Sequence, residues 1–203
     1  MTSVVVFGAG GRAGRAVLAE AERRRVDATP VLRDPSRHPD VADAVPGDAT
    51  SAADVERVAR GHDAAIVAVY AADLDPAAYG PAMRALLEGL ERAAVPRLLL
   101  VGVATTLPGE HGVAVFEEPG FPAEWRPFAQ ARADEVAVLE RYAGPVDWVV
   151  LTPPMELVEK PGDTRYEIRD FGNPLTYAAL ACALLDEAAE SRHHRRQIGI
   201  SGG

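Results

Sequence analysis

Short apolar runs alternate with amphipathic segments along most of the chain. Runs at 3–7, 64–70, 97–101 and 146–151 predict strands that are buried on both faces. Helical patterns follow at about 15–25, 51–60, 76–94, 127–142 and 176–189. Strands that alternate with helices through short connections predict a parallel sheet with right-handed crossovers. We therefore expect an α/β fold of the Rossmann type, a doubly wound sheet with helices on both faces.

Weaker patterns complete this sheet and a small C-terminal extension. We expect strands at 26–32, where Pro30 removes a ladder donor, at 45–49 and near 197–200, with a short strand or hairpin at 161–169. Residues 103–126 and 152–175 lack a clear period, and irregular loops at the ligand edge of a sheet often form a substrate wall. The length of 203 residues favours a single domain, 1–203, with these two segments on the substrate side.

The first strand ends in a glycine-rich turn, Gly8-Ala9-Gly10-Gly11-Arg12-Ala13-Gly14. Glycine allows the sharp turn and lets a ligand approach the backbone, and the N–H groups of the following helix face an anion. The spacing fits both G-x-x-G-x-x-G and G-x-G-x-x-A, so the sequence predicts a site for a dinucleotide pyrophosphate. A tight turn without a ligand is the alternative. The predicted contacts are Gly8, Gly10, Gly11, Arg12, Ala13 and Gly14.

The second strand runs into Arg33-Asp34-Pro35-Ser36-Arg37. In such folds an acidic residue here binds the 2′-hydroxyl of the adenosine ribose and an arginine binds a 2′-phosphate. Arg33 comes first, and Arg37 and Arg12 can join it, which favours NADP(H) over NAD(H). Asp34 is the counter-argument, because it could bind the ribose, neutralise Arg33 or only initiate the Asp-Pro turn.

The carboxyl ends of the remaining strands nominate further cofactor contacts. Asp48 could accept a hydrogen bond from the adenine amino group, although Asp48 or Thr50 could equally cap the next helix. By the same rule the predicted set includes Ala49, Val69, Tyr70, Gly102 and Pro153.

Composition excludes several function classes. A net charge of −9 argues against a nucleic-acid surface, and the sequence has neither a signal-peptide pattern nor an apolar stretch long enough to span a membrane. We therefore expect a cytoplasmic protein. The lone Cys182 is expected to fill the core, and the pair His193-His194 is expected to be a solvated helix end, so no metal site is predicted.

Four segments resemble those of a known family: the glycine turn and residues 33–35, 147–153 and 175–177. In these segments the chain resembles the NmrA-like, atypical short-chain dehydrogenases/reductases. Segments 102–107, 121–122 and 161–166 are similar to those of NAD(P)H-flavin reductases akin to the biliverdin-reductase-B type. The resemblance implies NADP(H) binding through Gly8, Gly11, Arg12, Gly14, Arg33, Asp48 and Tyr70, with Thr105 or Thr106 and Pro153 near the nicotinamide.

The chain lacks the tyrosine-lysine pair that most short-chain dehydrogenases use, and this absence limits the reactions that it can catalyse. Most of them place a lysine four residues after a tyrosine, which lowers the pKa of the phenol so that it can donate a proton. The only lysine here is Lys160, and Glu156 stands four residues before it. Flavin reduction tolerates this gap because the proton can come from water. The catalytic candidates are then Thr105, Thr106 and Gln130, and the candidates for a stacking wall are Phe121, Trp125 and Tyr166.

The sequence thus favours an NADPH-dependent reductase of a flavin or similar flat acceptor, with a small-molecule substrate and a monomeric or homodimeric state. A catalytically silent NAD(P) sensor of the NmrA type is the alternative, which the missing dyad favours. A nucleotide-sugar epimerase or dehydratase ranks third, because that chemistry generally needs the dyad.

Overall fold

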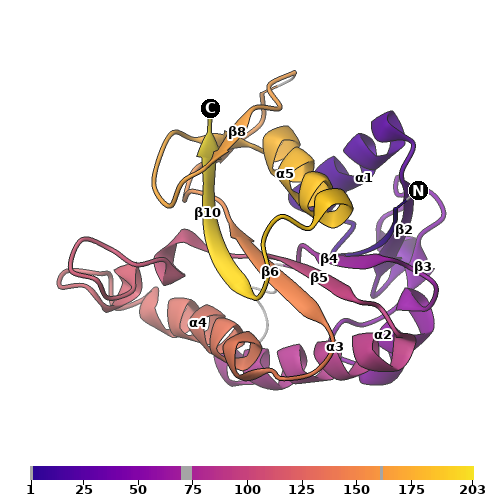
Figure 1. The fold of residues 1–203 in the computed structure, drawn as a ribbon, viewed down its shortest axis with the longest axis horizontal. Helices are drawn as coiled ribbons and strands as arrows, with labels where there is room; N and C mark the ends of the chain where they lie inside the picture. Colours follow the sequence, from indigo (N-terminus) through magenta and orange to yellow (C-terminus); the bar gives the residue numbers. More distant parts are fainter. Residues whose placement is uncertain (1, 70–74, 161) are drawn as a thin grey trace.

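An eight-stranded sheet forms the centre of the molecule (Figure 1). The computed structural model describes residues 2–69, 75–160 and 162–203. The strands lie in the order β3-β2-β1-β4-β5-β6-β10-β8, and all are parallel except β8, which runs antiparallel to β10. Their bounds are β1 (Ser3–Phe7), β2 (Asp27–Leu32), β3 (Val45–Pro46), β4 (Ala64–Val67), β5 (Arg97–Val101), β6 (Asp147–Thr152), β8 (Tyr166–Ile168) and β10 (Arg196–Gly202).

Five helices cover the two faces of this sheet, as the alternating pattern predicts. Helices α1 and α5 pack together on one face, and α2, α3 and α4 line the other (Figure 1). Their bounds are α1 (Arg12–Arg24), α2 (Ala52–Ala59), α3 (Tyr79–Ala93), α4 (Arg126–Arg141) and α5 (Tyr177–Glu190). The predicted α/β, doubly wound Rossmann-type fold is confirmed. None of the helices in the described residues is both long and apolar enough to cross a membrane.

Alternate residues of each central strand point to opposite cores. In β1, Val4 and Val6 pack against α1 and α5, whereas Val5 and Phe7 pack against the other helical layer. All four side chains are at most 1 % exposed. This double burial explains why the strand sequences are continuously apolar.

The order of the strands reverses between β1 and β4. The chain builds β1, β2 and β3 outward on one side and then returns to β4, β5 and β6 on the other. Connections at such a switch point diverge and leave a crevice above the carboxyl ends of the strands. The glycine turn after β1 lies at this point, so the topology places it where a ligand is expected.

The structure corrects several boundaries. Helix α1 begins at Arg12 rather than near Arg15, and the strand expected at 64–70 is described only to Val67. Strand β3 pairs only with Val31 and Leu32 of β2, so at Pro30 the strand β2 has a neighbour, β1, on one side only. The missing N–H of the proline can therefore face the unpaired side. A small parallel pair, β7 (Leu157–Val158) with β9 (Leu175–Thr176), lies in the C-terminal extension and was not expected from the sequence.

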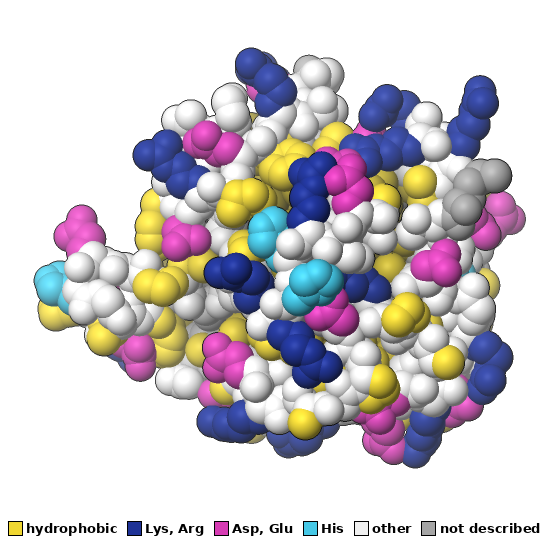
Figure 2. All heavy atoms as spheres, viewed as in Figure 1, with side chains coloured by type: hydrophobic (Ala, Val, Ile, Leu, Met, Phe, Trp, Pro, Cys, Tyr) yellow, Lys and Arg dark blue, Asp and Glu magenta, His cyan; other side chains and the backbone are white. Residues whose placement is uncertain are grey.

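The segment between β5 and α4 projects from the body of the molecule (Figure 1). It contains only the short 3-10 turns η3 (Ala104–Thr106) and η4 (Val115–Glu117), as its lack of period predicts. Figure 2 shows hydrophobic, acidic and histidine side chains on this projection, and acidic and basic groups interspersed over the rest of the visible face.

The amino edge of the sheet carries a buried ion network. Arg97, the first residue of β5, is 4 % exposed and pairs with Asp147 of β6 and Glu187 of α5. His193 and His194, predicted to form a solvated helix end, follow α5 with side chains that are 22 % and 65 % exposed. His193 Nδ1 lies 2.9 Å from Glu187 Oε2 and His194 Nδ1 lies 2.7 Å from Asp147 Oδ2, so both rings join this network.

Candidate functional site

The glycine turn after β1 is tightly packed at two of its glycines. Gly8 has a φ of +79°, and a Cβ there would lie 2.6 Å from the carbonyl oxygen of Ala68 beyond β4. A Cβ on Gly14 would lie 2.2 Å from the carbonyl oxygen of Gly8. Both positions therefore require glycine for the turn itself and for the packing of α1 against its strand.

Gly11 is different, because the space around it is open. It is exposed, its φ of −79° suits any residue, and a Cβ would approach only the Gly8 carbonyl oxygen, at 3.5 Å. Gly11 is also the N-cap of α1, which has no side-chain cap and no acidic residue in its first turn. The N-terminal N–H groups of α1 thus face a clear space, which fits the pyrophosphate of a dinucleotide.

The turn after β2 holds two exposed arginines, Arg33 and Arg37. Among the described residues, neither guanidinium has a hydrogen bond or an ion pair. Asp34 instead accepts hydrogen bonds from the backbone N–H and hydroxyl of Ser36, at 3.0 and 2.6 Å. These bonds hold the pKa of Asp34 below its usual value. Asp34 therefore initiates the turn, as one alternative had it, and leaves Arg33 without a neutralising partner.

Arg12 contacts α5, whereas two residues that the sequence did not nominate, Arg15 and His38, connect these turns. The Arg12 guanidinium lies 5.1 Å from the centre of the Tyr177 ring at the start of α5. Arg15 donates to the Gly10 carbonyl at 2.8 Å and pairs with Asp40. The ring of His38 occupies the space beside Gly10, where a Cβ would lie 2.7 Å from it. Arg15 and His38 thereby fix the glycine turn to the loop after β2.

Asp48 and Ala49 follow β3. Asp48 Oδ1 accepts from the backbone N–H and the hydroxyl of Thr50, each at 2.8 Å, so this carboxylate makes a local turn before α2. Ser51 caps α2 by accepting from the Asp54 N–H. Half-buried Ala49 packs on the core below. A contact from Asp48 to adenine stays a prediction.

The carboxyl ends of β5 and β6 meet through a set of hydroxyl groups. Gln197 of β10 donates to Thr106 Oγ1 and to Thr152 Oγ1, each at 2.8 Å. Gly102 leaves room for Thr152, whose Oγ1 would lie 2.3 Å from a Cβ at that glycine. Gln197 and Thr152 are the residues that sequence reasoning missed here, because 91 and 45 positions separate Gln197 from its two partners.

The two predicted catalytic threonines differ in their hydrogen bonding. Thr106 donates to the Val103 carbonyl at 2.9 Å and accepts from Gln197, so its hydroxyl is fully engaged. The Thr105 hydroxyl is buried and has no hydrogen-bond partner in the part of the chain that the structure describes. Gln130 is exposed on α4, and its amide donates to Asp134 at 3.0 Å. The structure does not join Gln130 to the threonines through any hydrogen bond of the described residues.

The remaining predicted contacts are placed as follows. Pro153 is buried directly after β6, and Val69 is half-buried after β4. Tyr70 lies outside the described residues. Trp125 is 52 % exposed, and Phe121 is half-buried beneath the guanidinium of Arg126, 5.7 Å from its ring centre. Tyr166 donates to Asp186 of α5 at 2.7 Å, so its hydroxyl is engaged and its place in a substrate wall stays a prediction.

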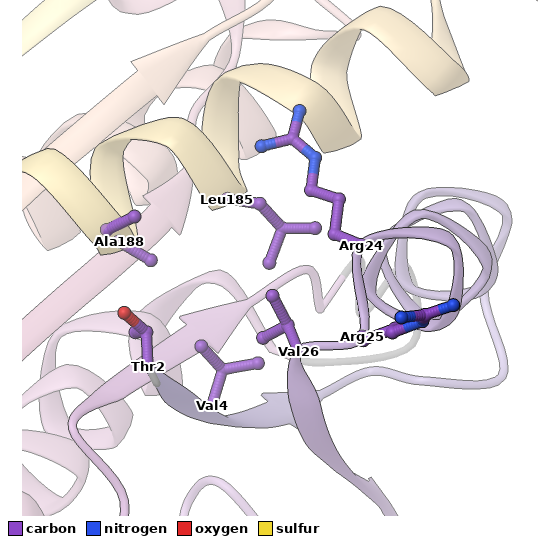
Figure 3. A pocket seen from close by; sticks show the side chains of 8 residues that line it. Thr2, Val4, Arg24, Arg25, Val26, Leu185 and Ala188 are labelled. Carbon is purple, nitrogen blue, oxygen red and sulfur yellow. The ribbon is translucent and has the colours of Figure 1, made fainter.

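A cavity of about 430 Å³ lies elsewhere, at the amino edge of the sheet (Figure 3). Val4, Val26 and Leu185 line it together with Arg24 and Arg25 near the end of α1. It is remote from the glycine turn, because Val4 lies near the start of β1 and the turn follows its end. Arg24 is bound to Glu20 and Asp186, and Arg25 is exposed at the end of the helix.

Comparisons with known proteins agree with this geometry. The family described as NAD(P)H-binding matches residues 8–186. The uncharacterized protein YwnB of Bacillus subtilis (strain 168) is 25 % identical over 206 residues, which cover 96 % of each chain.

Solved structures share the fold over nearly their whole length. A Streptococcus pneumoniae protein provisionally named an NADH-flavin reductase is 24 % identical, covers 100 % of both chains and has a TM-score of 0.83. An anaerobilin reductase from Escherichia coli O157:H7 is 18 % identical, covers 99 % of this chain and 97 % of its own, and has a TM-score of 0.79. A Bacteroides thetaiotaomicron protein provisionally named an epimerase is 24 % identical, with a TM-score of 0.82 over 98 % and 96 % of the two chains.

Proposed function

The chain belongs to the NAD(P)H-binding family, and from that premise we propose that it is an NADPH-dependent reductase of a flavin or similarly flat, conjugated acceptor. The observation that carries the cofactor choice is the uncommitted guanidinium of Arg33. Asp34, which would favour a ribose hydroxyl, is bound to Ser36 instead. Arg33 and Arg37 are therefore free to bind a 2′-phosphate, which a planar guanidinium suits well.

The chain's own residues would hold the cofactor in an extended position along the carboxyl edge. The N–H groups at the start of α1 bind the pyrophosphate above Gly11, and Gly8 and Gly14 keep that turn in place. When bound, NADPH supplies the hydride. Near β5, Thr105 and Thr106 would lie on the nicotinamide side, and Gln197 holds Thr106 and Thr152 in position.

The two segments expected to form the substrate wall expose large apolar side chains. Trp125 and Met155 are 52 % and 69 % exposed, in the two segments expected to form the substrate wall. Exposed apolar side chains of this size suit a flat ring that stacks against them. The missing tyrosine-lysine dyad disfavours ketones, whereas a flavin can take its proton from water. The names of two structural neighbours, a flavin reductase and an anaerobilin reductase, support a conjugated acceptor.

A silent NAD(P) sensor is the second candidate, and the missing dyad is the observation that favours it. Both candidates need the same dinucleotide site. They differ in turnover, because a sensor binds the reduced and oxidised cofactor without passing a hydride to an acceptor.

Two measurements on purified protein test the proposal. Fluorescence titration with NADPH and NADH should give at least tenfold tighter binding of NADPH, as expected for one charge-assisted phosphate contact. NADPH oxidation followed at 340 nm should then depend on added FMN, FAD or a quinone. Equal affinity for the two cofactors would overturn the NADPH assignment. Tight binding with no acceptor-dependent oxidation would replace the reductase with the sensor.

A further inference from the structure

A buried ion pair on α4 has no part in the site described above. Arg132 and Glu135 are 5 % and 7 % exposed, and Arg132 Nη1 lies 2.8 Å from Glu135 Oε2. A buried pair of this kind is weak evidence for stability, because the cost of removing both charges from water offsets their attraction. Its place in the fold therefore calls for another explanation.

A hydrogen bond joins the ion pair to the carboxyl end of β5. Arg132 Nη2 donates to the carbonyl oxygen of Val101, the last residue of β5, at 2.7 Å. The strand continues into Gly102 and η3, the turn assigned above to the nicotinamide side. Helix α4 packs against η3, so the guanidinium lies directly beneath that turn.

The pair is also only partly satisfied. Arg132 Nε and Glu135 Oε2 are buried and make no hydrogen bond among the described residues, although the two side chains stand at ion-pair distance. The guanidinium carbon lies 5.7 Å from the centre of the Tyr79 ring of α3. A carboxylate that is buried with one cation and few hydrogen bonds gains or loses a proton at modest cost.

Burial raises the pKa of Glu135 to about 7, and the charge of Arg132 offsets part of that rise. Among the described residues, Arg132 on the same helix is the charged group that acts on Glu135, and the Tyr79 ring of α3 lies against the Arg132 guanidinium. Near neutral pH the pair therefore has two charge states. Its net charge is +1 when Glu135 is protonated and zero when Glu135 is ionised.

We propose that the charge state of the Arg132–Glu135 pair sets the preference of this site between oxidised and reduced nicotinamide cofactor. The inference rests on the proposed function, since it requires the nicotinamide to bind above η3. An oxidised nicotinamide ring carries a positive charge and a reduced ring does not. With Glu135 protonated, the unbalanced Arg132 repels the oxidised ring through a poorly screened interior; with Glu135 ionised, that repulsion disappears.

The two equilibria are linked in both directions. If loss of the Glu135 proton tightens NADP⁺ binding by a certain factor, then NADP⁺ binding must increase the acid dissociation constant of Glu135 by the same factor. NADPH binding should leave the proton in place. This difference between the two cofactors separates a charge effect on the nicotinamide ring from any effect on the shared adenosine half.

The experiment measures the dissociation constants of NADP⁺ and NADPH at pH 6.0 and pH 8.5 by calorimetry. The ratio of the NADP⁺ constant to the NADPH constant should fall about three- to tenfold at the higher pH, because ionisation of Glu135 removes the repulsion between two positive charges. Titration of the 2′-phosphate affects both cofactors alike and cancels in the ratio. Glu135→Gln should abolish the pH dependence, whereas Asp134→Asn, at the exposed neighbour on α4, should retain it.

A second measurement guards against a Glu135→Gln protein that does not fold. Unmodified protein is titrated with each cofactor at pH 7 in two buffers that differ in ionisation enthalpy, which reports proton release. Greater proton release with NADP⁺ than with NADPH supports the inference, because any release from the 2′-phosphate is common to both cofactors. A pH-independent ratio, or equal proton release with both cofactors, overturns it while leaving the proposed function intact. No binding of either nucleotide would overturn the proposed function and this inference together.

Discussion

Two sets of arginines at opposite edges of the central sheet, Arg97 at the amino edge and Arg33 with Arg37 at the carboxyl edge, are in opposite chemical states. At the amino edge, Arg97 is buried and donates to Glu187 at 2.5 Å and to the His193 carbonyl at 2.8 Å, in addition to its pairing with Asp147. At the carboxyl edge, Arg33 and Arg37 are exposed and have no hydrogen bond or ion pair within the described ranges.

This difference separates structural charge from functional charge. A guanidinium that is buried with two carboxylates is satisfied by the fold and has nothing left for a ligand. Exposed guanidiniums near an open helix N-terminus are suited to binding an anion, and among the described residues no carboxylate pairs with Arg33 or Arg37. If the comparison is right, substitutions at the amino edge should change stability without changing cofactor affinity, and those at the carboxyl edge should do the reverse.

The largest effect is expected from Arg97→Met. It leaves Glu187 buried without its cation, which should lower the free energy of unfolding by about 3–5 kcal/mol in urea titrations. Arg92→Met, which removes an exposed pair with Glu88, is the matched control and should cost less than about 1 kcal/mol. Under conditions where the protein is folded, NADPH affinity should be unchanged. A large loss of affinity would show that the two edges are coupled.

The next effect is at Gly11. Gly11→Val adds bulk where the pyrophosphate must approach, so NADPH binding should weaken at least about a hundredfold, or about 2.7 kcal/mol. Because a Cβ at this position meets only one atom, at 3.5 Å, the melting temperature should change little. Ala19→Val, at an exposed position of the same helix, should bind NADPH normally. Unchanged binding in Gly11→Val would remove the glycine turn from the site.

The amino edge also predicts a dependence of stability on pH. Glu20 is buried at the end of α1, and hydrogen bonds from Arg23, with further ones from Arg24 and Cys182, lower its pKa to about 2 despite its burial. A carboxyl whose pKa is depressed in the folded state stabilises the protein above its unfolded pKa of 4.5, and this contribution is lost as the pH falls toward 2.

After allowance for solvent screening, the loss should be about 2 kcal/mol. Urea titrations at pH 5.0 and 2.5 measure it. In Glu20→Gln the decrease between these two pH values should be smaller by that amount. An equal decrease in both proteins would show that the Glu20 cluster does not titrate with unfolding.

The smallest effect is expected at the end of β2. Arg33→Ala should weaken NADPH about tenfold, or about 1.4 kcal/mol, because one charge-assisted contact to the 2′-phosphate is lost. NADH, which lacks that phosphate, should bind as before. Arg141→Ala, at another exposed arginine, on the last residue of α4, is the control and should leave both affinities unchanged. A comparable loss for NADPH and NADH would contradict the assignment of Arg33.

The local pattern of the chain predicts much of the fold and the location of the site. The apolar strand at 3–7 and the glycines at 8, 11 and 14 identify the first strand, the turn and the helix, because backbone conformation and burial at neighbouring positions depend on those residues alone. The sequence predicts the ends of helices less well. Helix α1 begins at Arg12, three residues before the predicted start at Arg15, because its N-cap is Gly11, which has no side chain to mark the position.

Long-range pairing of polar side chains could not be predicted in the same way. Glu187 is 90 positions from Arg97, and Gln197 is 91 positions from Thr106. No periodicity links such residues, so the sequence gives no sign that His193 and His194 belong to an ion network or that Gln197 belongs to the candidate site. The short β7 and β9 pair was missed for a related reason, since two-residue strands carry too little pattern to detect.

The sequence by itself therefore determined the alternation of elements, the parallel sheet and the position of its dinucleotide turn, because each depends on neighbouring residues. Only the tertiary structure decided which charges are free. It engaged Arg97 with two distant carboxylates and left Arg33 exposed. Whether a charged side chain is neutralised depends on which distant groups the packing brings within hydrogen-bonding distance, and that is a property of the folded chain.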